Sequence, residues 1–392
     1  MTEALGRSQV FEYLIDLSKN NKIYLISFEK SCNHEKLNQI EKLSELNNIE
    51  WKYFQYSNKY GIFSTLIQII ISVIYSAQLV MKNNIDIVHS RSMIPGTMAV
   101  ILRKFFNIKH IFDIRGFVFD EKVDNGRLNE FGALFKMLKK LEKILYKNSD
   151  HIVTLTEVSK NIISEQYKIS PHRISVIPTC ASQDVFTLIN EKEKFKIKCE
   201  LGFSEKDLIL IHTGSVSNSY DFDLEVSLFR YLHEQDVRIK FLVVNKGEHE
   251  YIKTVFKRYD IDENMYKVIS SDFENVHKYL NISIASIFFI PPTHSKKASS
   301  PTKFAENLLC HLPSITNIGV GDMQILMNKY NVGYILDMDD LKLNMESLGT
   351  NVYNFIKKEQ SYEFLELYNE KFNKANASKQ YGIIYDLILK KF

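Results

Sequence analysis

The chain has 392 residues, of which 45% are hydrophobic and 25% charged, so its composition is that of a globular protein with material for two hydrophobic cores. The formal net charge of +3 gives no reason to expect a nucleic-acid partner. The polar start of the chain does not resemble a signal peptide. Four scattered cysteines predict reduced, buried thiols in a cytoplasmic protein: Cys32, Cys180, Cys199 and Cys310.

Short apolar segments that suit buried strands alternate along the chain with longer segments of helical periodicity, such as Phe131–Lys147 and Lys303–Cys310. Alternating strands and helices predict parallel sheets with helices on both faces. The predicted strands are Lys22–Phe28, Trp51–Tyr56, Ile85–His89, His110–Asp113, His151–Leu155, Ile174–Ile177, Leu208–Thr213, Ile239–Val244, Tyr266–Ile269, Ile284–Ile290, Pro313–Thr316 and Gly333–Leu336.

This pattern occurs twice, which predicts an α/β fold of two Rossmann-like, doubly wound domains. We place the first domain at residues 1–182 and the second at residues 183–374, because turn-favouring residues follow a strand in Pro178–Phe186. Residues 375–392 are expected to form a helix that returns to the first domain. In such sheets ligands bind beyond the carboxyl ends of the strands, so the functional residues should lie in loops that face a cleft between the domains.

One apolar segment, Ile62–Met81, contains no charged residue and is long enough to span a bilayer. Serine, threonine and glutamine residues dilute it, and a predicted strand follows directly. We therefore expect a buried helix between two strands rather than a membrane span.

The segment that follows the predicted strand Ile284–Ile290 contains the residues that most strongly suggest a binding site. Ser299 and Ser300 suit a helix N-cap and Pro301 the first helical position. The free N–H groups of a helix start suit a phosphate, and Lys303 would add a full charge. Glu306 lies three residues further on the same helix face, where it could accept the hydroxyls of a ribose. The alternative is a capped surface helix with a Lys303–Glu306 ion pair.

The stretch from Ser299 to Pro313 resembles the nucleotide-sugar motif of retaining family 4 glycosyltransferases, which have the GT-B fold. The resemblance implies that Glu306 holds the donor ribose, and that the helix start, including Thr302, holds the diphosphate. It also implies that Gly214 and Ser215 form a loop that approaches the diphosphate. Further segments resemble the branch that builds bacterial capsules and O-antigens: Gly6–Gln9, His89–Ser92, Phe112–Gly116, Asp120–Glu121, Leu141–Glu142, Ser149–Thr156, Val176–Thr179 and Asn317–Asp322.

The chain departs from the family pattern at two places. The family usually has a glutamate eight positions before Glu306, and here that position is Ala298. A domain of this kind also normally begins with a central parallel strand before a loop such as Met1–Gln9, and here Gly6 is already the sixth residue. We therefore expect the first strand to be missing and the first sheet to have a gap or to repack.

The acceptor side of the site is expected in the first domain. Asp113, Arg115 and Glu121 are candidate catalytic residues, which would orient the acceptor or handle its proton. The alternative is an Asp–Arg pair that stabilises a loop. His89 and Arg91 end another predicted strand and are weaker candidates. Gly6 and Arg7 precede a helix expected near Ser8 and could face the donor phosphates, or form a frayed terminus.

No histidine or cysteine spacing resembles a metal site, and the D-x-D pairs, including Asp337 and Asp339, do not suit the predicted fold. We therefore expect a metal-independent enzyme without a cofactor other than its UDP- or GDP-linked sugar donor. The helical segment Phe135–Lys147 carries five lysines and could contact an anionic membrane surface. The alternative is a helix packed on the sheet with a solvated lysine face.

Taken together, the residues and the resemblance predict a retaining hexosyl- or glycosyltransferase. Its acceptor would be a glycan or a polyprenyl-linked saccharide in surface polysaccharide biosynthesis, and it would work in the cytoplasm, at the inner face of the plasma membrane if it contacts lipid. Two alternatives remain: a GT-B sugar-nucleotide epimerase, and a non-catalytic partner subunit of the same fold.

Overall fold

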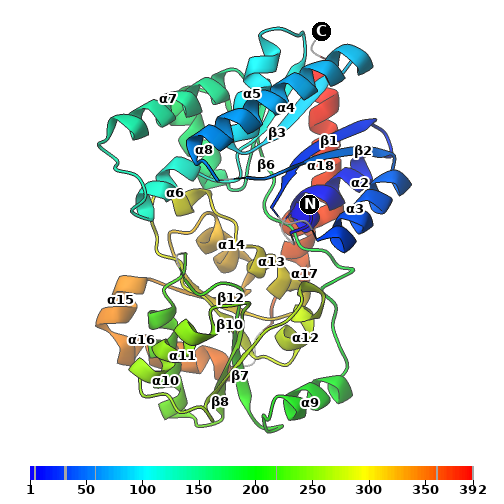
Figure 1. Ribbon diagram of the computed structural model, residues 1–392. Coiled ribbons are helices and arrows are strands. Elements are labelled where there is room, and N and C mark those ends of the chain that lie inside the picture. The colour runs from blue at the N-terminus through cyan, green and yellow to red at the C-terminus, as the bar shows by residue number, and fades with distance from the viewer. Residues whose placement is uncertain (4–5, 31–32, 58, 218, 359–360, 391–392) are drawn as a thin grey trace. The chain divides into compact units, whose positions relative to one another are not determined.

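The computed structural model describes residues 1–392 except 4–5, 31–32, 58, 218, 359–360 and 391–392 (Figure 1). Cys32 and part of the Met1–Gln9 loop therefore lie outside the described residues. The chain forms two compact units: unit 1 comprises Met1–Cys180 and Asn373–Phe392, and unit 2 comprises Ala181–Phe372. These junctions lie two residues before the boundaries expected from the sequence.

Unit 2 is built on one parallel sheet of six strands in the order β12-β11-β10-β7-β8-β9. The order reverses between β10 and β7, so this is the switch point beside which ligands of doubly wound sheets bind. The strands are β7 (Leu208–Thr213), β8 (Ile239–Val244), β9 (Tyr266–Ile269), β10 (Ala285–Ile287), β11 (Ser314–Asn317) and β12 (Gly333–Leu336).

Two hydrophobic clusters cover the two faces of this sheet. Phe288, Phe304 and Leu308 belong to one cluster, and Phe229, Phe241 and Phe256 belong to the other. The helices are α9 (Glu191–Glu200), α10 (Phe222–Gln235), α11 (His249–Arg258), η3 (Phe273–Asn275), α12 (Val276–Asn281), η4 (Ser295–Ala298), α13 (Thr302–Leu309), α14 (Met323–Tyr330), α15 (Met338–Leu343), α16 (Met345–Lys357), α17 (Phe364–Leu367) and η5 (Tyr368–Phe372).

Within its described residues, unit 1 contains two separate parallel sheets rather than one. One sheet has two strands, β1-β2, and the other has four, β3-β4-β5-β6. The expected gap in the first sheet is thus confirmed, and it lies between β1 and β3. The strands are β1 (Ile23–Glu29), β2 (Ile49–Gln55), β3 (Ile87–Arg91), β4 (Lys109–Asp113), β5 (His151–Thr154) and β6 (Ile174–Val176).

The C-terminal helix α18 (Lys374–Leu389) belongs to unit 1 and packs against α2 (Figure 1). The rings of Tyr13 and Tyr381 meet edge to face there, 5.8 Å between centroids. The other helices of the unit are η1 (Arg7–Phe11), α2 (Glu12–Leu17), α3 (His34–Leu46), α4 (Ile62–Asn83), α5 (Met93–Arg103), α6 (Val118–Asp124), α7 (Ala133–Lys147), α8 (Glu157–Tyr167) and η2 (Pro171–Arg173).

The apolar segment forms a helix, α4, as predicted, but the expectation that this helix is buried is wrong. The part Phe63–Asn83 is long and apolar enough to cross a membrane, and only 17% of its most apolar 18-residue stretch is buried. Periodicity identified the helix, but it could not show that only one side of this apolar helix packs on the unit. The exposed apolar side chains, each 44–72% exposed, are Phe63, Leu66, Ile67, Ile70, Ile71, Ile74 and Met81.

Smaller expectations also need correction. Cys180 and Cys310 are buried free thiols, but Cys199 is exposed near the end of α9. The segment predicted as the strand Ile284–Ile290 forms a strand only over Ala285–Ile287. The first helical segment begins at Arg7, which agrees with the start expected near Ser8.

Candidate functional site

The loops that follow β7 and β10 bring the predicted donor residues of unit 2 to one edge of the sheet. Gly214 directly follows β7 with φ +89°, a conformation that favours glycine. Gly214 and Ser215 are exposed at the tip of this loop. The loop after β10 leads through η4 to helix α13, which carries Lys303 and Glu306. Because β7 and β10 are neighbours in the sheet, both loops lie at the switch point.

A buried polar network connects the two loops. His212, the penultimate residue of β7, is fully buried, as is Glu225 of α10. The His212 Nδ1 lies 2.7 Å from the Glu225 carboxylate, and its Nε2 lies 2.9 Å from the carbonyl oxygen of Ser215. The ammonium of Lys303 lies 3.2 Å from the same Nε2. This network ties helix α13 to the β7 loop.

Lys303 is a buried cation that lies beside two aromatic rings. It is 7% exposed, and its ammonium lies 3.9 Å from the ring centroid of Tyr220 and 5.3 Å from that of Phe288. Burial lowers the pKa of Lys303 to about 8, against the opposing effect of the Glu225 and Glu306 carboxylates. A nearby anion such as a phosphate would favour the charged form of this buried lysine.

Glu248, which the sequence did not single out, holds the β7 loop in place. Its carboxylate accepts hydrogen bonds from the backbone N–H groups of Val216 and Ser217, at 3.1 and 3.3 Å, and from the Asn245 side chain at 2.7 Å. Asn245 also donates to the carbonyl of Gly214 at 2.8 Å. Although burial opposes it, hydrogen bonds from Ser217, Asn245 and the loop backbone lower the pKa of Glu248 to about 2. Acidic residues after a strand are common, so only the fold shows this role.

The start of α13 differs by one residue from the prediction. Pro301 occupies the N-cap position, Thr302 is the first helical residue, and no side chain caps the helix. The prediction that Ser299 or Ser300 would be the N-cap is therefore wrong, because Pro301 is extended with ψ 124° rather than helical. Ser299 and Ser300 remain immediately before the helix start and are half-buried.

Glu306 is the fifth residue of α13 and is 8% exposed. After burial, which is the larger effect on each group, the charge of Glu306 raises the pKa of the neighbouring Lys303, Tyr220 and Cys310. Ala298, in the position where the family usually has a glutamate, is fully buried. The adjacent loop after β11 is pinned by a hydrogen bond from the Gly321 N–H to the Lys296 carbonyl, at 2.9 Å.

In unit 1, Asp113 at the end of β4 is the centre of a buried cluster. It is 1% exposed, and Tyr381 of α18 donates a hydrogen bond to it at 3.1 Å. Arg91 and Arg115 lie 3.5 and 3.9 Å from its two oxygens. This geometry matches the alternative interpretation, an Asp–Arg cluster that stabilises loops, and it leaves little of Asp113 accessible to a substrate.

The other predicted residues of unit 1 lie around this cluster. The Arg91 guanidinium also donates to the Gln9 carbonyl at 2.5 Å, and Arg115, with φ +55°, donates to Thr179 at 3.3 Å. Burial lowers the pKa of His89 to about 4, and its ring contacts the Tyr385 hydroxyl at 2.9 Å. Glu121 lies on α6 and is absent from the described contacts of Asp113. Gly6 precedes η1, and Arg7 is exposed.

Among the residues that the structure describes, no group of three or more histidine, cysteine, aspartate or glutamate side chains could hold a metal ion. The D-x-D residue Asp337 instead caps helix α15, where it accepts hydrogen bonds from the N–H groups of Asp339 and Asp340 at 2.8 and 3.1 Å.

Comparison with known families supports the interpretation of this arrangement. A model described as Glycosyltransferase Family 4 matches residues 44–184, which cover most of unit 1. A second model, of a spumavirus aspartic protease, matches residues 141–271. That range begins within α7 of unit 1 and ends beyond β9 of unit 2. It therefore corresponds to no folded unit, and no function follows from it.

Curated relatives point to the same chemistry. The chain is 22% identical over 283 residues to an Escherichia coli UDP-Gal:alpha-D-GlcNAc-diphosphoundecaprenol alpha-1,3-galactosyltransferase, covering 71% of this chain and 69% of that one. It is 24% identical over 333 residues to the N-acetyl-alpha-D-glucosaminyl L-malate synthase of Bacillus anthracis, covering 80% and 78%. The chain is thus similar to family 4 glycosyltransferases. The resemblance that the sequence motifs carry is thereby confirmed.

Solved structures show the fold of this chain. The structure of Anabaena HepE in complex with UDP and glucose matches with a TM-score of 0.65 and 12% identity, covering 96% of this chain and 95% of that one. A sucrose-phosphate synthase from Thermosynechococcus elongatus matches with a TM-score of 0.65 and 11% identity, covering 94% and 100%. The predicted GT-B fold of two Rossmann-like domains is confirmed.

Proposed function

We propose that this glycosyltransferase moves a hexose-type sugar from a nucleoside diphosphate, bound by unit 2, to a lipid-linked saccharide held by unit 1. The transfer would retain the anomeric configuration and would serve the synthesis of a bacterial surface polysaccharide. The observation that carries the proposal is the buried Lys303, which the His212–Glu225 pair connects to the β7 loop at the switch point of unit 2.

The donor diphosphate would lie between the exposed Gly214–Ser215 tip and the start of α13. Backbone N–H groups at both places would donate to its oxygens, and the ammonium of Lys303 would neutralise the charge that develops on the leaving diphosphate. This arrangement supplies the electrostatic stabilisation from the chain itself, so we propose transfer without a metal ion. Glu306 would accept the hydroxyls of the ribose.

The name of the Escherichia coli relative includes a UDP-linked donor and a diphosphoundecaprenol-linked acceptor, and Anabaena HepE was solved with UDP. These two names favour a uridine nucleotide and a polyprenyl-linked acceptor for this chain. The acceptor would meet unit 1 at the carboxyl ends of β3 and β4, near His89, Arg91 and Arg115, with Gly6 and Arg7 alongside. Asp113 would position the two arginines, and Glu121 remains a candidate for handling the acceptor proton.

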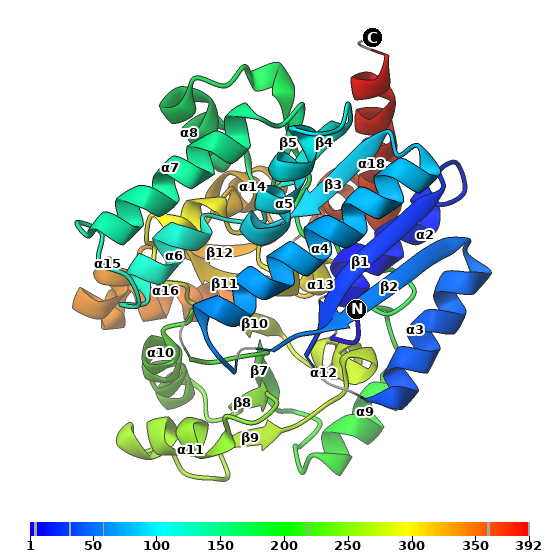
Figure 2. The same cartoon turned by 45° about the horizontal axis from the view of Figure 1, so that its top comes forward.

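A lipid-linked acceptor requires access to a bilayer, and one surface of unit 1 suits an anionic membrane. The outer side of α4 exposes the apolar residues named above. Helix α7 exposes Leu134, Met137 and Ile144 together with four lysines. Both helices contact α5 (Figure 2). Apolar side chains with interspersed lysines favour the interface of an anionic bilayer, so we place the enzyme at the cytoplasmic face of the plasma membrane. The lysines are Lys136, Lys140, Lys143 and Lys147.

Calorimetry with UDP, GDP, CMP and ATP, without added metal and in the presence of EDTA, tests the donor site. Selective binding of UDP would support the proposal and identify the base. Equal binding of ATP, or binding that requires a divalent cation, would contradict it. If none of the four binds, the chain would be a non-catalytic member of the fold. Product analysis with the UDP-sugar alone distinguishes an epimerase from a glycosyltransferase, because an epimerase would convert the UDP-sugar without an acceptor.

A further inference from the structure

The Nε2 atom of His212 has two neighbours that make opposite demands on it. The carbonyl oxygen of Ser215 lies 2.9 Å away and can only accept a hydrogen bond. The ammonium of Lys303 lies 3.2 Å away and, when charged, can only donate one. A ring nitrogen carries either a hydrogen or a lone pair, so Nε2 satisfies only one of these two neighbours at a time.

The other ring nitrogen of His212 is held by Glu225. Nδ1 lies 2.7 Å from one carboxylate oxygen of Glu225, and the second oxygen accepts a hydrogen bond from the N–H of Phe289 at 3.2 Å. An ionised carboxylate only accepts, so Nδ1 carries a hydrogen. The rings of Tyr220 and Phe222 meet the imidazole edge to face, with centroids 5.3 and 5.8 Å away. The ring is therefore fixed in place, while its Nε2 atom can exist in either form.

This geometry allows two protonation states of the network. In the first state the imidazole is neutral, and Nε2 accepts a hydrogen bond from Lys303. In the second state the imidazole is a cation, Nε2 donates to the Ser215 carbonyl, and the lysine ammonium is repelled from the ring. The second state has one more positive charge than the first. The other titratable groups around the His212–Lys303 pair are Glu225 of α10, Tyr220 of the loop before α10, and Glu306 of α13.

A diphosphate at the start of α13 would favour the second state. Its negative charge would attract the Lys303 ammonium away from Nε2 and would also stabilise an additional proton on the imidazole. Nε2 would then donate to the Ser215 carbonyl. The next residues of the loop are already held, because the N–H groups of Val216 and Ser217 donate to Glu248 at 3.1 and 3.3 Å. The exposed tip of the loop would thus become fixed when the diphosphate is present.

We propose that His212 is a positioning residue of the donor site, which takes up a proton when a nucleoside diphosphate engages Lys303 and thereby fixes the Gly214–Ser215 tip. This inference rests on the proposed donor site in unit 2. His212 acts through Lys303 and the Ser215 carbonyl, and it couples occupancy of the site to the order of the loop. The role of Glu225 is to keep a hydrogen on Nδ1, so that Nε2 is the ring atom that gains the proton.

Nitrogen NMR of the full chain with ¹⁵N-labelled histidine tests this inference, because the shifts of the ring nitrogens report which of them carries a hydrogen. The spectra are recorded at pH 7, where Lys303, with a pKa of about 8, is already mostly charged. We expect His212 to carry a hydrogen on Nδ1 alone without UDP, and on both nitrogens with saturating UDP. An imidazole with the same protonation state in both samples would overturn the proposal.

Calorimetry in buffers of different ionisation enthalpy measures the same proton. The unchanged chain should take up about half a proton or more per UDP at pH 7, and UDP itself can only lose a proton in a cationic site. Lys303→Met removes the cation that competes for Nε2, so both ring nitrogens should carry a hydrogen with and without UDP. In Glu225→Gln the new amide donates to Nδ1, so the neutral ring should carry its hydrogen on Nε2 in both samples. A His212 signal that still responds to UDP in either variant would overturn the proposed coupling.

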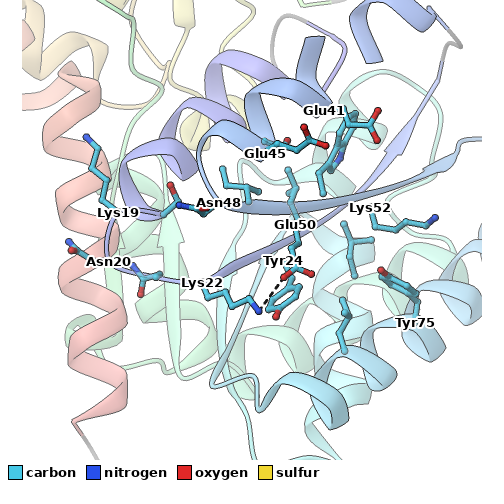
Figure 3. A pocket seen from close by; sticks show the side chains of 18 residues that line it. Lys19, Asn20, Lys22, Tyr24, Glu41, Glu45, Asn48, Glu50, Lys52 and Tyr75 are labelled. Atoms are coloured by element: carbon cyan, nitrogen blue, oxygen red, sulfur yellow. Dashed lines mark ion pairs between the residues drawn. The ribbon is translucent and has the colours of Figure 1, made fainter. Parts of the chain in front are cut away.

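Matched controls make the same chemical changes elsewhere. His212→Gln assigns the NMR signal and should abolish the proton uptake, whereas His233→Gln, in the last turn of α10 with its Nδ1 2.7 Å from the Ile239 carbonyl, should preserve it. Glu50→Gln changes a carboxylate of unit 1 that pairs with Lys22 at 3.2 Å in a hollow of about 880 Å³ (Figure 3), and it should leave UDP binding and the His212 signal unchanged.

The two proposals fail in different ways. If the unchanged chain binds no UDP, the donor site and the role of His212 are both overturned. If UDP binds while the protonation of His212 stays the same, the role of His212 alone is overturned, and the proposed function stands.

Discussion

Lys303 is the residue whose protonation should control donor binding. Burial lowers the pKa of Lys303 to about 8, so the side chain is a cation below that pH and becomes neutral above it. We expect the affinity for UDP to fall as the pH rises through about 8, because the neutral amine no longer compensates the diphosphate charge. Calorimetry at a series of pH values between 6.5 and 9.5 measures this dependence.

The variant Lys303→Met removes the charge and keeps an apolar side chain of similar length. It should weaken UDP binding about 10- to 100-fold, the effect of losing one charge-assisted hydrogen bond, and should remove the pH dependence near 8. Lys297→Met, an exposed lysine on the same loop, is the matched control. A pH dependence that persists in Lys303→Met would assign the titration to another group.

Glu306 is the second residue of the proposed donor site. Glu306→Gln keeps the size of the side chain but makes it a weaker acceptor for the ribose hydroxyls, so we expect about a tenfold loss of UDP affinity with the fold intact. Circular dichroism checks the fold, and the exposed Glu346→Gln on α16 is the control. Unchanged affinity would move the ribose contact elsewhere.

Asp113 illustrates a residue whose role follows from burial rather than from sequence. Asp113→Asn would leave Arg91 and Arg115 close together without their shared anion. Breaking a buried charged cluster in this way costs about 3–5 kcal/mol, and we expect denaturant unfolding to show a loss of this order. Asp86→Asn, at an exposed position before β3, should have an effect within about 0.5 kcal/mol. A loss of activity without loss of stability would instead support direct contact with the acceptor.

At the scale of elements, α4 and α7 decide whether the enzyme contacts a bilayer. The double variant Ile70→Glu with Ile74→Glu adds two negative charges to the apolar outer side of α4 without touching a buried residue. We expect it to reduce sedimentation with vesicles rich in anionic lipid, because the charges oppose both apolar insertion and lipid attraction. Leu343→Glu, on an exposed apolar residue of α15 in unit 2, should bind vesicles like the unchanged chain.

Because of the lysines of α7, the binding of this surface to anionic vesicles should depend on salt concentration. Lys136→Gln with Lys140→Gln should weaken vesicle binding at low ionic strength, and the difference from the unchanged chain should shrink at high salt. Binding to vesicles of neutral lipid separates the apolar contribution of α4 from the electrostatic contribution of α7, since only the α4 double variant should weaken it. Equal binding of every variant to anionic vesicles would exclude this face of unit 1 as the membrane contact.

At the scale of the whole molecule, the proposed reaction needs both units and both substrates. We expect NMR of the product to show the anomeric configuration of the donor sugar. Retention would agree with displacement on one face of the sugar, in which the leaving diphosphate is stabilised by unit 2. An inverted product would contradict the proposal, and a stable glycosyl-enzyme adduct would replace single-step displacement by a covalent mechanism.

The sequence by itself determined the elements and the reaction class. Every predicted strand is present, because short β-branched runs between helical segments report burial on both faces of a parallel sheet. The Ser299–Pro313 motif indicated the resemblance to family 4 glycosyltransferases, since helix starts and neighbouring charges are local features of the chain. The gap in the first sheet was also expected, because the resemblance implies a domain that begins with a central strand.

Only the tertiary structure decided which sides of these elements are covered. Apolar periodicity could not distinguish the outer side of α4, which is exposed, from its inner side, because both are apolar. The roles of Glu248 and His212 are visible only in the folded chain, where the loops after β7, β8 and β10 meet at one edge of the unit 2 sheet. Asp113 likewise meets Tyr381 from the far end of the chain. Contacts between remote segments depend on how the sheets and helices pack, and local sequence does not encode that packing.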